Sequence, residues 1–367
     1  MSTSSLTKRL GAAALAALTA VSLTACAGGS TSDGGNGGGN AAGDDNKIVF
    51  WSNHPGKSRD LEQELIDAFE KENPDLSVEL VDGGANYEEL AQKFNAALAG
   101  NDLPDVIVAS DVTWFNFALN DATTPLDELW ESENIDSDSY VDTLRDDYLY
   151  DGKHYGVPYS RSTNLMYWNT DDLAAAGLPT DRGPETWQEF DEWADKLKEK
   201  TGHPALTIPD GSSYLDWYFQ GMVWAFGGAY SNEWEPTFSD PKTIEAAKFL
   251  QDQVQKGHIE ISTDPTVAFG NGNASALLES TGSLGGLKDS ATIPFITTYL
   301  PGPGPSAATG GAGLAVPNGI SDARKKNAVK FIDFITNTEN TIKFSQKTGY
   351  MPVRKDCLLY TSPSPRD

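Results

Sequence analysis

The strongest constraint on the fold is a regular alternation of strand and helix patterns between residues 47 and 109. Short apolar runs rich in β-branched residues predict strands at 47–52, 76–81 and 104–109. Apolar residues at helical spacing predict helices over 59–73 and 87–99. This order is typical of an α/β fold in which helices cover both faces of a largely parallel sheet.

The same order predicts where a ligand would bind. Open α/β sheets bind ligands beyond the carboxyl ends of their strands, which here hold residues 51–53, 82–84 and 110–111. Farther along, the patterns predict a hairpin turn at 151–158 that enters a strand. They also predict strands at 164–168 and 309–316 and helices over 186–200 and 324–336.

The amino-terminal residues predict export and a lipid anchor. Lys8 and Arg9 precede an apolar run at 10–24 that is too short to span a membrane, as in a signal peptide. The run ends in Leu-Thr-Ala-Cys, which resembles a bacterial lipobox, so we expect a signal peptide at 1–25 and a lipidated Cys26. An ordinary secretion signal with an accidental cysteine is the alternative. Residues 26–46 then form a Gly-rich flexible tether.

Composition excludes several classes of function. The 367 residues carry 27 Lys and Arg against 53 Asp and Glu, a formal net charge of −26, which argues against nucleic acid as a partner. Two cysteines and four scattered histidines predict neither a disulfide scaffold nor a metal site, and we expect no cofactor. The chain has no hydrolase motif, and residues 302–307 fit the dinucleotide-binding pattern G-x-G-x-x-A only loosely, with two prolines that indicate a turn. An enzyme, such as a secreted hydrolase, is therefore the competing class of function.

A series of motifs resembles the extracellular solute-binding proteins of ABC importers, in the carbohydrate-type family 1. In chain order the motifs are FWSNH, AFEKENPDLSVE, GGANYEELAQKF, PDVIVAS, DGKHYGVPYSRSTNLMYWN, AAGLP, ETWQEF, STGSLGGL, GGAGLAV and KTGYMPVRK. The resemblance implies a two-lobed type II periplasmic-binding fold that closes like a hinge on its ligand. It places lobe one at 47–157 with 291–336, and lobe two at 158–290 with 337–356.

Within this family the chain is most similar to proteins that bind sn-glycerol-3-phosphate, and that likeness implies a set of ligand-binding residues. It assigns phenol, carboxylate, hydroxyl and backbone contacts to Tyr87, Tyr350, Asp111, Ser162, Ser280 and Gly311. Trp51, Tyr214 and Trp217 are aromatic candidates by position only. Arg161 departs from the family pattern and either supplies an anion partner or points to solvent. For the other residues the alternative is a structural role as helix cap, turn or core residue.

The end of the chain departs from the family. Residues 357–367 (CLLYTSPSPRD) resemble the conceptual translation of a sequencing adapter, whereas family members continue with further helices that include a phosphate-clamping arginine. We therefore expect a C-terminally truncated fold in which that arginine cannot be assigned. A genuine Ser- and Pro-rich end is the alternative.

Together these features predict the substrate-binding lipoprotein of an ABC importer. The expected ligand is glycerol-3-phosphate or a glycerophosphodiester, and the alternative ligand is a neutral mono- or oligosaccharide. We expect a monomer at the extracellular face of the cell membrane. Its partners would be the permease subunits and their cytoplasmic ATPase.

Overall fold

The computed structural model describes residues 45–100, 102–304 and 306–357, all within one compact unit spanning residues 41–367. The predicted signal peptide, Cys26, most of the tether and the tail from residue 358 lie outside the described residues. No described helix combines the length and the apolar character that a bilayer crossing requires.

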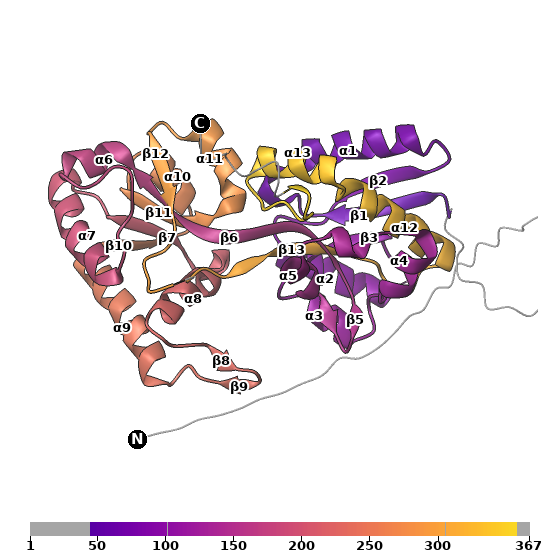
Figure 1. The fold of residues 1–367 in the computed structure, drawn as a ribbon, viewed down its shortest axis with the longest axis horizontal. Helices are drawn as coiled ribbons and strands as arrows, with labels where there is room; N and C mark the ends of the chain where they lie inside the picture. Colours follow the sequence, from indigo (N-terminus) through magenta and orange to yellow (C-terminus); the bar gives the residue numbers. More distant parts are fainter. Residues whose placement is uncertain (1–44, 101, 305, 358–367) are drawn as a thin grey trace, which may run out of the picture. The chain divides into compact units, whose positions relative to one another are not determined.

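The predicted strand and helix alternation is confirmed at the start of the body. The elements are β1 (Lys47–Ser52), α1 (Arg59–Glu72), β2 (Ser77–Asp82), α2 (Tyr87–Leu98) and β3 (Val106–Ser110). Both β2 and β3 pair with β1 in parallel. Figure 1 shows these elements gathered in one half of the unit.

Two long antiparallel strands, β6 (Val157–Asn169) and β13 (Thr309–Ala315), carry the chain between the two halves (Figure 1). The amino-terminal part of β6 pairs with β13, and its remainder pairs with β11 (Ala276–Ser280) and β12 (Phe295–Thr298). The predicted strand at 164–168 is therefore not separate. It continues the strand that follows the hairpin of β4 (Leu149–Tyr150) and β5 (Lys153–His154).

The second half extends the same sheet with β7 (Leu206–Pro209) and β10 (Ile259–Ser262), which pair in parallel. Among the described residues this sheet has nine strands, ordered β10-β7-β11-β6-β13-β3-β1-β2, with β12 beside β6. Its helices are α6 (Thr170–Ala175), α7 (Trp187–Thr201), α8 (Leu215–Ala225), α9 (Pro241–Lys256), α10 (Pro265–Gly270) and α11 (Leu284–Ser290).

The predicted helix over 186–200 shows how sequence sets these limits. The Thr186 side chain accepts a hydrogen bond from the Glu189 amide at the start of α7, and Gly202 takes a left-handed conformation (φ 78°) at its end.

Two further helices, α12 (Asp322–Ile335) and α13 (Thr338–Thr348), follow β13. The other described elements are short: α3 (Trp114–Leu119), α4 (Asp127–Glu133), α5 (Asp142–Asp146), the hairpin of β8 (Ser231–Asn232) and β9 (Glu235–Pro236), and 3-10 turns at Pro55–Lys57, Ser137–Ser139, Gly211–Ser213 and Thr281–Ser283.

Two large hydrophobic cores underlie the two halves. The first core is built around β1–β3 and α12, and the second around β6, β7, β11 and α7. Phe344 and Val353 pack in the first core and Leu300 in the second, whereas the sequence assigned 337–356 to lobe two and 291–336 to lobe one. The residues of α12, such as Phe331, stay in the first core, so only the part of 291–336 around Leu300 packs with the second half, and the limits of the lobes remain a prediction.

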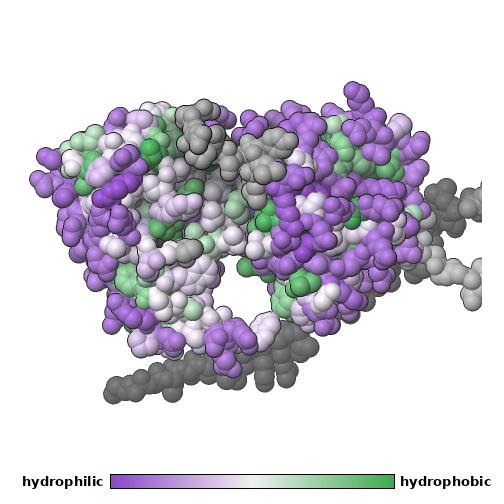
Figure 2. Space-filling model, in the orientation of Figure 1, coloured by the Kyte–Doolittle hydropathy of each residue, from purple (hydrophilic) through white to green (hydrophobic). Residues whose placement is uncertain are grey.

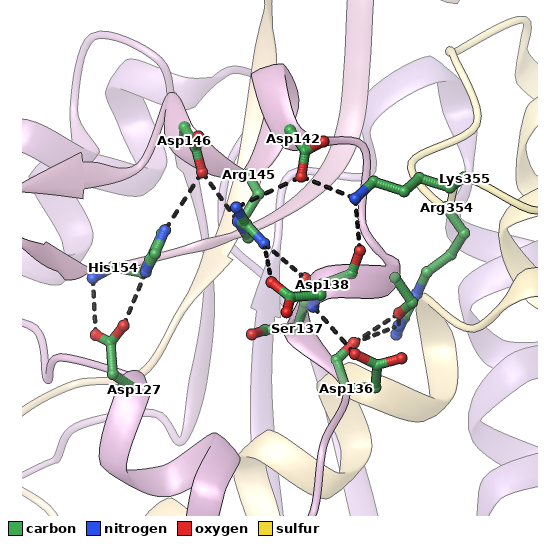
Figure 3. Close-up of polar contacts among 11 residues, drawn as sticks. Asp127, Asp136, Ser137, Asp138, Asp142, Arg145, Asp146, His154, Arg354 and Lys355 are labelled. Carbon is green, nitrogen blue, oxygen red and sulfur yellow. Dashed lines mark hydrogen bonds and ion pairs between the residues drawn. The ribbon is translucent and has the colours of Figure 1, made fainter.

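A polar network fixes the last described segment to the first core (Figure 3). Arg354 is buried, stacks over the Tyr140 ring at 3.7 Å and donates to the Tyr140 hydroxyl at 2.8 Å. Beside it, Lys355 pairs with Asp142 at 2.8 Å. These contacts hold the chain that follows α13 against α5, and so fix the position of Tyr350.

Candidate ligand-binding cleft

A cavity of about 540 Å³ lies where the first-core and second-core elements meet. Figure 2 shows the surface hollowed between the two halves. The cavity lies beyond the carboxyl end of β3, as predicted, and receives residues from β6, α8, β11 and β13 as well. Its principal lining residues are Tyr87, Asp111, Ser162, Tyr214, Asp216, Trp217, Tyr218, Tyr230, Asp264, Thr266, Glu279, Ser280, Gly282, Gly311 and Tyr350.

Most of the expected ligand-binding residues meet in this cavity, although whether they touch a ligand stays a prediction. The residues brought together are Tyr87, Asp111, Ser162, Trp217, Ser280, Gly311 and Tyr350. Trp51 does not line the cavity: its side chain is buried in the first core, beneath the Lys93 ammonium at 4.3 Å from the ring centroid.

Arg161 also lies outside the cavity lining, and it does not point to solvent. The residue is 1% exposed, and its guanidinium donates to the Asp147 carboxylate and to the Tyr148 hydroxyl, the latter at 3.1 Å. The solvent alternative for Arg161 is therefore wrong. Its charge acts on the cleft from beneath the surface.

Asp111 stands at the end of β3, where its backbone N–H donates to the Gly311 carbonyl at 3.0 Å. Burial raises the pKa of the Asp111 carboxyl to about 6, and the nearby Arg161 charge partly opposes that rise. A Cβ atom at Gly310 would lie 2.5 Å from the Trp217 Nε1 and 2.9 Å from an Asp111 carboxylate oxygen. Only glycine lets the indole and the carboxylate approach one backbone this closely.

Tyr350 and Tyr87 form the polar aromatic edge of the cavity. The Tyr350 ring lies between two glycines, since a Cβ at Gly282 would be 2.6 Å from its Cζ and a Cβ at Gly56 would be 2.9 Å from its Cε2. The Tyr87 hydroxyl is buried and lies beside the side chains of Ser160 and Tyr350. Burial raises the Tyr87 pKa, and the Ser160 and Tyr350 side chains partly oppose that rise, so the phenol keeps its proton and can act as a neutral hydrogen-bond donor.

Glu279 is a cavity residue that sequence reasoning missed. Its carboxylate is 8% exposed and accepts hydrogen bonds from the Tyr218 hydroxyl, the Ser280 N–H (2.7 Å) and the Thr266 hydroxyl (3.2 Å). Burial raises its pKa. The signal was a lone acidic residue inside the apolar run Ala-Leu-Leu-Glu-Ser, just before a residue already predicted to bind ligand.

Ser280 is a turn-capping residue, the structural alternative stated above for the predicted ligand contacts. Its hydroxyl accepts a hydrogen bond from the Gly282 N–H at 3.0 Å, at the start of the following turn. The hydroxyl proton remains available to a ligand.

The cavity lining contains no Lys, Arg or His among the described residues. Its carboxylates come from Asp111, Asp216, Asp264 and Glu279, and its aromatic wall from Tyr214, Trp217, Tyr218 and Tyr230. Hydroxyl groups and a cation suit this lining, whereas a dianion alone does not.

A second cavity of about 520 Å³ adjoins the first and shares Tyr87, Tyr214, Gly282 and Tyr350 with it. Its lining has the opposite character: it includes His54 and Lys57 but, among the described residues, no Asp or Glu. In neither cavity nor elsewhere in the described part of the chain do three or more His, Cys, Asp or Glu side chains gather as metal ligands would.

Two α/β halves, joined by crossing strands around a polar and aromatic cleft, define a two-lobed binding protein. The chain belongs to the bacterial extracellular solute-binding protein family, which matches residues 64–366. It is an ABC-importer solute-binding protein close to the glycerol-3-phosphate-binding proteins.

Specific relatives support this placement. The chain is 28% identical over 329 residues to the sn-glycerol-3-phosphate-binding periplasmic protein UgpB of Pectobacterium atrosepticum, covering 83% of this chain and 73% of that protein. The crystal structure of UgpB from Mycobacterium tuberculosis in complex with glycerophosphocholine superposes with a TM-score of 0.83 at 47% identity, covering 85% of this chain and 83% of that one. Maltose-bound MalE3 of T. maritima, at 23% identity and a TM-score of 0.76, shows the shared fold alone.

Proposed function

We propose that this protein is the substrate-binding lipoprotein of an ABC importer and that it captures a glycerophosphodiester with a cationic head group, such as glycerophosphocholine. The observation that carries the proposal is the charge of the first cavity, which has carboxylates and an aromatic wall but no cationic side chain among its described lining residues. Aromatic faces and carboxylates attract quaternary ammonium groups. The likeness to a glycerophosphocholine-bound relative supports the same ligand class.

Each part of such a ligand has a partner of suitable chemistry. The Asp111 carboxylate accepts from the glycerol hydroxyls, each of which must be paired once it leaves water. The hydroxyls of Ser162 and Ser280 and the backbone at Gly311 serve the phosphodiester oxygens, while the hydroxyls of Tyr87 and Tyr350 lie at the junction with the second cavity. The head group rests against Trp217 and its aromatic neighbours.

Glycerol-3-phosphate fits less well because it is a dianion without a compensating cation. It would bring two negative charges to a lining that already holds several carboxylates. A phosphodiester carries one negative charge, and the choline group neutralises it within the same molecule. A neutral sugar brings no negative charge to the cavity, but it also provides no cation for the carboxylates and aromatic rings of the lining.

The remaining parts of the proposal concern place and partners. Lipidation of Cys26 would hold the protein at the extracellular face of the cell membrane through the 26–46 tether. There the monomer would deliver its ligand to permease subunits driven by a cytoplasmic ATPase, without itself catalysing a reaction. The relatives named above are solute-binding proteins, which supports this role.

Isothermal titration calorimetry with the mature chain tests the proposal. We expect micromolar binding of glycerophosphocholine and at least roughly tenfold weaker binding of glycerol-3-phosphate, a difference of about 1.4 kcal/mol. Maltose serves as the neutral-sugar arm. Tighter binding of glycerol-3-phosphate, or binding of maltose alone, would contradict the proposed ligand. Hydrolysis products in the same samples, detected by phosphorus NMR, would instead support a hydrolase.

A further inference from the structure

A hydrogen bond crosses the cleft at the junction of the two cavities. The Tyr214 hydroxyl, at the start of α8 in the second-core half, donates to the Glu88 Oε2 in the first turn of α2, over 2.6 Å. The Tyr214 ring also lies 6.4 Å from the Tyr87 ring, between centroids. Tyr214 therefore connects the two halves at a point remote in sequence from the β6 and β13 crossing strands.

The Tyr214 backbone is held in an unfavourable conformation. Its φ is +68° in the left-handed region, which a bulky residue rarely adopts. The conformation places the Tyr214 carbonyl where it accepts the Trp217 N–H at 3.0 Å, at the first turn of α8. Strain of this kind persists only where surrounding contacts maintain it, and it is concentrated at ligand clamps and switch regions.

A second contact crosses the cleft from the hairpin of β8 and β9. Trp234 at the hairpin tip stacks on Phe115 of α3, with ring centroids 6.1 Å apart and an interplanar angle of 29°. Phe115 in turn meets the edge of Tyr150 at 5.1 Å. Trp234 is otherwise open to solvent: the residue is 82% exposed, and Phe115 is the one described ring that it contacts.

The hairpin shares its base with α8, which links the two contacts. The Tyr230 hydroxyl at the foot of the hairpin donates to the Asp216 carbonyl in α8 at 2.7 Å, and the Thr237 N–H donates to the Tyr230 carbonyl at 2.9 Å. In Figure 1 the hairpin extends from the second-core half toward the side where α3 lies. A movement of α8 relative to the first core would break both contacts together.

We propose that two contacts between the halves hold the cleft closed: the Tyr214–Glu88 hydrogen bond and the stacking of Trp234 on Phe115. We call these two contacts the clasp. The clasp does not depend on which ligand is bound, because its partners are protein groups. A ligand that fills the cavity between them adds contacts to both halves, so the clasp and the ligand stabilise the same closed arrangement. Its function is to slow ligand release.

The test combines a ligand-free distance measurement with a ligand-release rate. Spin labels at Lys71→Cys in α1 and Lys248→Cys in α9, in a Cys26→Ser, Cys357→Ser background, report the separation of the halves by double electron–electron resonance. We expect Tyr214→Phe and Trp234→Ala each to shift the distance distribution toward longer separations. Tyr299→Ala is the control, because Tyr299 is also 82% exposed but makes no described ring contact with the first core.

Stopped-flow release of glycerophosphocholine gives the second readout. We expect roughly 5- to 10-fold faster release from Tyr214→Phe and about threefold faster release from Trp234→Ala. Glu88→Gln should match Tyr214→Phe, and the double variant should add little to either one. Distance distributions and release rates like those of the unmodified protein would overturn the clasp. Failure of glycerophosphocholine to bind would instead count against the proposed ligand, and the ligand-free distances would still test the clasp.

Discussion

The two adjoining cavities of the cleft differ in charge although they share several lining residues. The first presents Asp111, Asp216, Asp264 and Glu279 beside an aromatic wall. The second has no carboxylate among its described lining residues and presents Lys57 and His54, whose Nδ1 lies 2.5 Å from the buried Glu62 carboxylate. A ligand with separated charges would find a different partner on each side of Tyr87 and Tyr350. Under the proposed function, this difference would orient a zwitterionic ligand with its ammonium in the first cavity and its phosphate turned toward the second.

The largest expected effect on ligand affinity comes from a carboxylate of the first cavity, Asp111. Asp111→Asn removes the charge that, under the proposed function, accepts hydrogen bonds from the glycerol hydroxyls, and it leaves the side-chain volume nearly unchanged. We expect affinity for glycerophosphocholine to fall about 100-fold, the loss of a hydrogen bond to a charged group in a desolvated site. Calorimetry measures the change, and Asp252→Asn on the exposed face of α9 is the matched control. Unchanged affinity would remove Asp111 from the ligand site.

The aromatic wall should distinguish ligands with and without a cation. Trp217→Ala should weaken glycerophosphocholine roughly tenfold, because it removes a cation–π partner, and should affect glycerol-3-phosphate much less. Equal losses for both ligands would mean that Trp217 contacts the glycerol phosphate rather than the head group. Competition titration with both ligands decides between these outcomes.

Because the Asp111 carboxylate is buried, we also expect it to lower the free energy of unfolding at neutral pH, although it strengthens ligand binding. Because its folded-state pKa is raised from 3.8 to about 6, the folded protein binds more protons than the unfolded chain between these values. The contribution of Asp111 to the free energy of unfolding therefore falls as pH rises from about 4 to 6. Asp111→Asn should raise the free energy of unfolding at pH 7 by on the order of 1 kcal/mol, and by nothing near pH 3. Urea titrations at the two pH values measure it; a loss of stability at pH 7 would contradict the assigned burial.

The smallest effect concerns the second cavity. Lys57→Gln should weaken glycerophosphocholine only two- to threefold, since one exposed cation contributes about 0.5 kcal/mol, and the loss should shrink as salt is added. Lys71→Gln, exposed in α1 and away from both cavities, is the control. A salt-independent or larger loss would mean that Lys57 contacts the phosphate directly.

The sequence predicted the parts of the fold that local patterns determine. Helix and strand limits in β1–β3, α7, α12 and β13 follow from apolar periodicity and capping residues, and the carboxyl end of β3 predicted the position of Asp111. The separate strand at 164–168 was wrong because β6 is buried along almost its whole length and lacks a turn signal, so periodicity could not show that it is continuous.

The errors at the site arose where tertiary packing decides the role of a residue. Trp51 follows a predicted strand like a ligand contact, yet it packs beneath Lys93 in the first core. Arg161 finds Asp147 and Tyr148 only after β6 is paired, so no spacing could reveal its burial. Glu279 was missed because a charge within an apolar run is commonly a solvated residue, and its donors come from α8 and α10.

A crystal structure of the complex with glycerophosphocholine tests the charge division of the cleft most directly. We expect the trimethylammonium against Trp217 in the first cavity and a glycerol hydroxyl on the Asp111 carboxylate. We expect the phosphate oxygens near the hydroxyls of Ser162 and Ser280, on the side of the cavity that Tyr87 and Tyr350 share with the second cavity. A ligand with its head group in the second cavity beside His54 and Lys57, or one bound outside the first cavity, would contradict it.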